Sequence, residues 1–265
     1  MTPLRTLNGL ILLCLALLLG LAVMAPPLPD VGRLSAAVQS RAADNLLQTA
    51  LGAGKDTLSP VAPRFRTRVG GVEYEVAPLV PYQLEALIVS RHDSKSFSDY
   101  IHQAANDQLN ILDLCMVWGE FTASGAYRLF HYSNGQFSCT WQGKGEAALQ
   151  AANVGGIYLD NYHVLSDDPQ ISKRLLDLKI GDQVQLSGYL ADYGLAGGHA
   201  LRQSSLGRKV VDGRPAGCEV FYVQDVRIIQ RGPYHAFWRP LFWGACVLLL
   251  LLLLVWYQTP VRVLR

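Results

Sequence analysis

Two long apolar segments, one near each end of the chain, constrain the fold more than any other feature. The first covers residues 7–25 without a charged side chain, and a proline cluster follows it. The second covers residues 238–258 and contains an unbroken leucine run from Leu248 to Leu254. A helix of about 20 apolar residues crosses a hydrocarbon core of roughly 30 Å. Both segments therefore predict transmembrane helices.

A cleaved signal peptide is the alternative for the first segment. Arg5 precedes it, and Val23 and Ala25 fit the small-residue positions of a cleavage site. Pro26 would follow the cut, which signal peptidase disfavours. We therefore expect a retained anchor.

Positive charges beside the two segments predict the orientation of the chain. Arg5 precedes the first segment, and Arg262 and Arg265 follow the second. Because Lys and Arg resist translocation, residues 1–6 and 259–265 are expected to be cytoplasmic tails. The residues between the segments would then face the periplasm from the inner membrane of a bacterium.

The region between the two segments divides into a connecting part and a domain. Residues 26–70 are expected to hold an amphipathic helix from about Val31 to Leu51, followed by a linker from Ser59 to Gly71. Residues 71–232 are expected to form one extracytoplasmic domain.

The domain has the pattern of a mainly β, α+β fold. Apolar, strand-like runs surround a hairpin signal at Asn134-Gly135, a helix is expected at Ile171 to Leu178, and two further strands follow. This order is typical of the OB-fold, a five-stranded Greek-key barrel with a helix between its third and fourth strands. A surplus strand near Leu112 to Phe121 leaves a β-rich domain of another topology as the alternative.

Several short stretches of the domain form a recognisable pattern. They are Ser90–Asp93, Asp113–Gly119, Asn161–His163, Gly181–Val184 with Gly188–Leu190, and Gly217–Val220. The pattern, which covers Leu84 to Ile229, resembles an uncharacterised group of bacterial membrane-anchored proteins with an OB-like extracytoplasmic domain. The resemblance implies no activity and no catalytic residue.

Three cysteines lie in the domain, and an oxidising compartment favours a disulfide between two of them. Cys139 with Cys218 is the preferred pair, because the third and fifth strands of an OB-fold lie side by side; Cys115 is the other candidate. The net charge of +2 is too small to predict binding to nucleic acid.

Two histidine patterns offer chemistry, although neither has a diagnostic spacing. His92, Asp93, Asp99 and His102 could hold a metal ion, with His92, Asp93 and His102 as the preferred ligands, but a polar loop that caps a short helix explains them more simply. His92, Asp93 and His163 could form a hydrolase site, in which an aspartate orients a histidine base. No serine or cysteine elbow accompanies these residues, so we expect no cofactor and no strong catalytic site.

The loop from Gly194 to Lys209 is the preferred binding site. In an OB-fold it would join the fourth and fifth strands, a position that faces ligands, and it carries Arg202, Arg208 and Lys209. The sequence thus predicts a membrane-anchored binding or assembly module. Its expected partners are the lipid bilayer, a protein or a second copy of the chain, and an envelope glycan. The alternatives are an envelope hydrolase and a purely structural subunit of a membrane complex.

Overall fold

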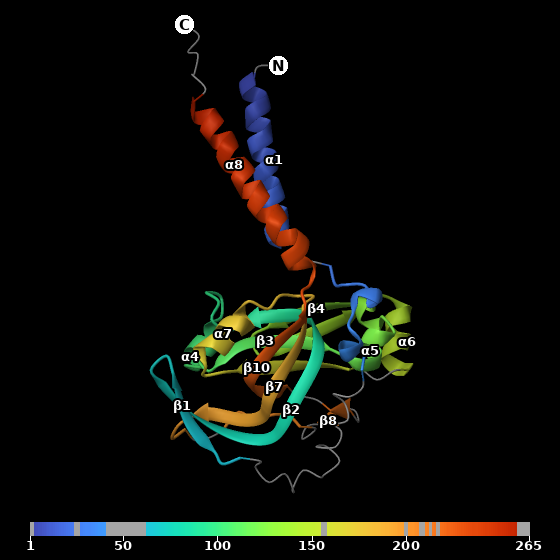
Figure 1. Cartoon of the computed structure of the whole chain (residues 1–265), viewed down its shortest axis with the longest axis vertical. Coiled ribbons are helices and arrows are strands. Elements are labelled where there is room, and N and C mark those ends of the chain that lie inside the picture. Colours follow the sequence, from blue (N-terminus) through green and yellow to red (C-terminus); the bar gives the residue numbers. More distant parts are fainter. Residues whose placement is uncertain are drawn as a thin grey trace. The chain divides into compact units, whose positions relative to one another are not determined.

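A computed structural model describes residues 3–23, 27–40, 62–154, 158–198, 201–206, 210–211, 214–215 and 218–258. The chain forms two compact units (Figure 1). One unit contains Met1–Pro27 and Arg231–Arg265, and the other contains Leu28–Gln230. Each unit is described by itself.

The first unit is a pair of helices, α1 (Pro3–Val23) and α8 (Arg239–Gln258), which contact each other. A π-helical turn, η3 (Tyr234–Trp238), precedes α8. Most of the leucine side chains of α8 are exposed to solvent. By length and composition α8 can cross a membrane, whereas the apolar helical stretch described in α1 is shorter, Leu7–Leu21.

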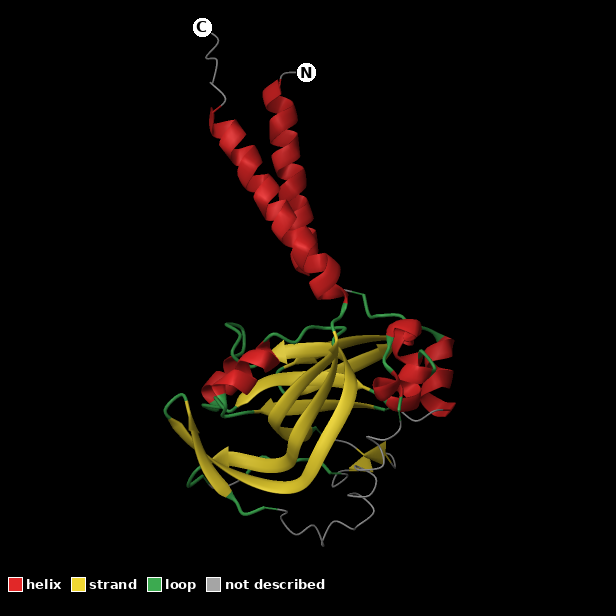
Figure 2. Ribbon diagram, in the orientation of Figure 1, coloured by secondary structure: helices red, strands yellow, loops and turns green. Residues whose placement is uncertain are grey.

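The second unit is built around a six-stranded sheet in which five strands close into a ring (Figure 2). Its strands, in spatial order, are β1 (Phe65–Val69), β2 (Val72–Asp93), β3 (Asn110–Val117), β6 (Leu159–Leu165), β10 (Glu219–Gln230) and β7 (Gln183–Leu195). The ring closes because β7 also pairs with β2. The contact between β6 and β10 is parallel, and the other pairings are antiparallel. The structure confirms a mixed α+β fold dominated by strands.

Strand β2 makes closure of the ring possible because it pairs with a different strand at each end, β7 and β3. It pairs with β7 from Tyr74 to Leu87 and with β3 from Leu87 to Asp93, and it curves strongly between these parts (Figure 1). The register with β7 shifts between Pro78 and Val80. Proline lacks the N–H that a ladder needs, so a bulge at this point is its natural place in a strand.

The interior of the ring is apolar, and helix α7 (Pro169–Leu176) packs against it. Asp168 caps this helix, since its carboxylate accepts hydrogen bonds from the backbone N–H groups of Gln170 and Ile171. Ile171 and Leu175 lie one helical turn apart and are both buried in the main core cluster. The helix thereby joins the same core as the five strands.

A small hairpin, β4 (Phe130–Gly135) and β5 (Ser138–Gly143), lies beside the main sheet. Gly135 pairs with Ser138, so the turn consists of Gln136 and Phe137 rather than the expected Asn134-Gly135. A Cys115–Cys139 disulfide ties this hairpin to β3. The expectation of one disulfide is confirmed, but the preferred pair of Cys139 with Cys218 was wrong.

Shorter elements complete the second unit. They are η1 (Val31–Arg33), α2 (Ala36–Gln39), α4 (Tyr100–Ala104), α5 (Gly119–Ala123), η2 (Ala126–Leu129), α6 (Glu146–Val154), β8 (Val210–Val211) and β9 (Arg214–Pro215).

The connecting region differs from its expected form. Leu34 has an extended backbone, so η1 and α2 replace the start of the expected helix from Val31 to Leu51, whose remainder lies outside the described residues. Part of the expected linker is strand β1. Its arginines alternate, as side chains on one face of a strand do, and they lie near glutamates of β2.

Candidate functional site

Three polar side chains lie in register across adjacent strands. His92 on β2 pairs with Asp113 on β3, and Asp113 pairs with His163 on β6. Directly opposed residues of antiparallel strands place their side chains on the same face, so this pairing brings the three groups together. Every residue of β3 is buried, which makes Asp113 a charge inside the protein.

The Asp113 carboxylate is satisfied by three donors. Nδ1 of His163 lies 2.6 Å from Oδ1, the Asn110 side-chain amide donates to the same oxygen, and the backbone N–H of Phe137 donates to Oδ2. Burial alone would raise the pKa of Asp113, but the hydrogen bond and charge of His163 outweigh burial and lower it. Asp113 is therefore a carboxylate that orients the imidazole of His163.

Cys218 lies on the same face, at the start of β10. Glu219 pairs with Tyr162 in the parallel contact of β10 and β6, which places Cys218 beside Asn161. The side-chain amide of Asn161 lies 3.3 Å from the Cys218 sulfur. Asn134 donates to the other end of that amide at 3.0 Å, so the N–H group of Asn161 is directed at the thiol.

Cys218 and His163 lie close enough to change each other's proton affinity. Burial raises the pKa of the Cys218 thiol, yet its hydrogen bond to His163 and the charge of His163 lower it further than burial raises it. Burial lowers the pKa of His163, but hydrogen bonds to Asp113 and Cys218 raise it to about 8. Cys218 is a free thiol with part of its surface exposed, so a reagent can reach it.

Arg202 covers the imidazole from the loop after β7. Its guanidinium carbon lies 3.6 Å from the ring centroid of Phe137, and Nη1 lies 3.1 Å from Nε2 of His163. Arginine is always a donor, so this contact needs an unprotonated Nε2, whereas the raised pKa favours a protonated one. Arg202 is exposed to solvent, whereas Asp113 on the other side of the imidazole is buried.

Phe137 forms one wall of the site in a strained conformation. Its φ of 59° lies in the left-handed region, where a bulky side chain is uncommon. Its ring centroid lies 3.8 Å from that of His102 and 5.3 Å from that of His163, and its carbonyl oxygen accepts from the Cys218 thiol. These contacts hold the residue in a conformation that costs about 1–3 kcal/mol.

A second histidine group adjoins this site. Nε2 of His92 lies 2.7 Å, and Nδ1 of His102 lies 2.5 Å, from the same carboxylate oxygen of Asp99. Asp93 does not join this group. Its carboxylate instead accepts from the backbone N–H of Lys95 and lies 3.9 Å from Arg91. Of the expected metal cluster, His92, Asp99 and His102 are thus together, and Asp93 lies apart.

The remaining residues that the sequence predicted for catalysis, binding or a disulfide do not form one group in the structure. Of the expected hydrolase set, His92 and His163 lie on the two strands that flank β3, with Asp113 of β3 between them. Arg208 and Lys209 lie outside the described residues. Cys218 was assigned to a disulfide and was missed as a thiol, although its neighbour Asn161 and the alternation of Asn161 and His163 on one strand face were visible in the sequence.

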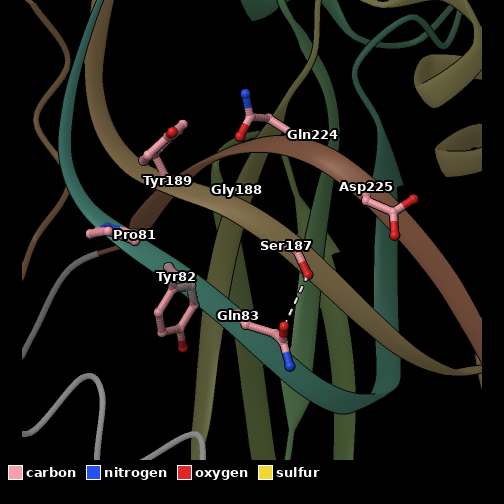
Figure 3. A pocket seen from close by; sticks show the side chains of 8 residues that line it. All are labelled: Pro81, Tyr82, Gln83, Ser187, Gly188, Tyr189, Gln224 and Asp225. Atoms are coloured by element: carbon pink, nitrogen blue, oxygen red, sulfur yellow. Dashed lines mark hydrogen bonds between the residues drawn. The ribbon is translucent and has the colours of Figure 1, made fainter. Parts of the chain in front are cut away.

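A shallow groove crosses the outer wall of the ring where β2, β7 and β10 meet (Figure 3). Pro81, Gln83, Tyr189 and Gln224 are among its lining residues. Asp225 at its rim is paired with Arg174 at 3.2 Å, and no lining residue belongs to the Cys218 site. The groove and the Cys218 site are therefore separate features of the surface.

The chain was compared with family models, curated proteins and solved structures, and none of the three comparisons produced a match.

Proposed function

We propose that this protein is a membrane-anchored envelope enzyme in which Cys218 carries out acyl transfer or hydrolysis. The observation that carries the proposal is the arrangement of Asp113, His163 and Cys218. An oriented imidazole beside a partly exposed thiol is the usual device for activating a cysteine nucleophile.

The roles of the residues follow from their contacts. His163 takes the thiol proton, and the thiolate of Cys218 adds to a carbonyl carbon. The leaving group accepts the proton from His163 as the carbonyl reforms, which produces a thioester; water or an acceptor then releases the acyl group and regenerates the thiol. Asn161, whose N–H group is directed at the sulfur, supplies a donor for the oxyanion.

We assign the ring to the OB-fold class. Three features support this assignment: the strand order β2-β3-β6-β10-β7 with closure onto β2, the parallel contact of β6 and β10, and the position of α7 between β6 and β7. Such barrels provide a rigid support for residues at strand ends and in loops.

The proposed location is the inner membrane, with the ring facing the periplasm. Helix α8 supports an anchor by its length and composition, and the Cys115–Cys139 disulfide supports an oxidising compartment. Reporter fusions after residue 54 test the location. Activity of an exported reporter is expected there, and activity of a cytoplasmic reporter would contradict it.

An acylation burst tests the proposed chemistry. The full chain in detergent, with Cys14 and Cys246 replaced by alanine, is treated with p-nitrophenyl acetate. We expect about one equivalent of p-nitrophenolate in the burst and an acetyl group on Cys218 by mass spectrometry. Cys218→Ala should abolish the burst, and His163→Gln should slow it. A burst that survives Cys218→Ala, or no burst at all in the folded parent protein, would refute the proposal.

Complementation of a deletion strain separates this function from a binding module. We expect Cys218→Ala to fail, and Arg208→Ala with Lys209→Ala to succeed. The opposite result, with both variants at normal abundance, would favour a module that binds its partner through the basic loop.

A further inference from the structure

We propose that His92, Asp99 and His102 form a binding site for a divalent cation of the zinc class. One donor atom from each residue lies within 4.8 Å of the other two. Two imidazole nitrogens and one carboxylate form a ligand set that suits zinc and its neighbours, whereas calcium and magnesium prefer oxygen alone. This proposal concerns residues that the thiol chemistry does not use.

The three ligands come from positions with fixed backbones. His92 lies near the end of β2, paired with Asp113. Asp99 is the N-cap of α4, and its Oδ1 accepts from the backbone N–H of His102 at 2.9 Å. The cap therefore leaves the second oxygen of Asp99 directed at the two imidazoles. A site of this kind is organised before the ion arrives.

Burial and charge also fit a cation. The side chains of Asp99 and His102 are 0% and 1% exposed, whereas that of His92 is 16% exposed, so the group is closed on the inside and reaches solvent through His92. The carboxylate of Asp99 is thus the acidic group at the closed end of the site, with one oxygen facing both imidazoles.

Ion binding would change the tautomer of His102. In the ion-free structure the side-chain nitrogen of Asn110 lies 2.8 Å from Nε2, so Nε2 accepts and Nδ1 carries the ring proton toward Asp99. Binding through Nδ1 moves the ring proton to Nε2, and rotation of the Asn110 amide presents its Oδ1, which has no hydrogen-bond partner among the described residues, as the acceptor. An oxygen of Asp113 lies 4.0 Å from Nε2. A carboxylate behind a ligating histidine is the usual support of such sites.

Cobalt and zinc binding to the full-length protein in detergent, after treatment with a chelator, tests the site. We expect one Zn²⁺ per chain by calorimetry. With Co²⁺ we expect visible d–d bands but no thiolate-to-cobalt charge-transfer band, because no cysteine belongs to the group. Absence of saturable binding by the folded protein would overturn the proposal, as would a charge-transfer band that disappears in Cys218→Ala.

Matched variants locate the ion. Asp99→Asn keeps an oxygen for the helix cap. Asp99→Asn and His102→Gln, each as a single variant, should lower the affinity for Zn²⁺ by more than about tenfold. Asp93→Asn makes the same chemical change outside the group, and His131→Gln changes an exposed histidine; both should bind as the parent does. Melting curves establish that each variant is folded. If Asp99→Asn and His102→Gln are folded and bind as tightly as Asp93→Asn, the site is refuted.

Discussion

Replacing His163 with glutamine should remove the reactivity of the Cys218 thiol toward alkylating reagents at acidic pH. The pKa of His163 is raised to about 8, so about 99% of the imidazole is protonated at pH 6 when it titrates alone. An unperturbed thiol of pKa about 8.5 is only about 0.3% thiolate at that pH. Each unit by which the thiol pKa is lowered raises this fraction about tenfold. Glutamine carries no charge, so the part of the lowering of the Cys218 pKa that is due to His163 is lost in the variant.

Alkylation by iodoacetamide measures this difference directly. The rate at Cys218 is followed by peptide mass spectrometry from pH 5 to 9, with His131→Gln as the control. Because the thiol and the imidazole are coupled, the parent profile should show two steps that belong to the pair. We expect His163→Gln to react at least about tenfold more slowly at pH 6. Superimposable profiles for the parent and the variant, with a single step near pH 8.5, would refute the reasoning.

Three further predictions concern stability, each measured by urea unfolding. Gly188→Ala should cost about 2–4 kcal/mol, since a Cβ there would lie 2.0 Å from a backbone carbonyl oxygen of β10, whereas Gly32→Ala has open space and should cost under about 0.5 kcal/mol. Equal effects of the two would contradict this packing. Burial, then the charge of a neighbouring glutamate, raises the pKa of Asp160 well above its usual value. Protonated Asp160 thus stabilises the folded protein fully below the pKa of the unfolded state, and this stabilisation is lost as pH rises toward the raised pKa of the folded state. Asparagine does not ionise, so the free energy of unfolding of Asp160→Asn relative to the parent should increase from pH 4 to 8. A difference that is independent of pH would contradict this prediction. Replacing Cys115 and Cys139 together should cost about 3.5 kcal/mol, from the chain entropy of a loop with a separation of 24 residues; no loss would indicate that the bond does not form.

Strands were the most predictable part of the fold, because their apolar patterns are local. The two strands expected after the helix at Ile171 to Leu178 are present as β7 and β10. Pairing is not local. No pattern within β10 shows that it lies parallel to β6, and the preferred disulfide failed because Cys139 lies in the side hairpin rather than in a strand of the ring.

The candidate site was predictable in its residues but not in its grouping. The sequence singled out His92, His102 and His163, whereas Asp113 was assigned no role in a site. Its role depends on the pairing of β3 with two other strands, a register that single-strand patterns do not contain. Phe137 could not be expected as a wall of the site, since its left-handed backbone follows from the turn that replaced Asn134-Gly135.

The position of β10 in the ring has a consequence for biogenesis. Although β10 is the last strand of the chain, it lies between β6 and β7 in the sheet. Until it has emerged, both of those strands expose unpaired edges, which favour aggregation and attract proteases. A nascent chain that stops before Cys218 lacks both the thiol and strand β10. The pair of His163 and Cys218 can therefore form only after β10 has been synthesised and has paired with β6.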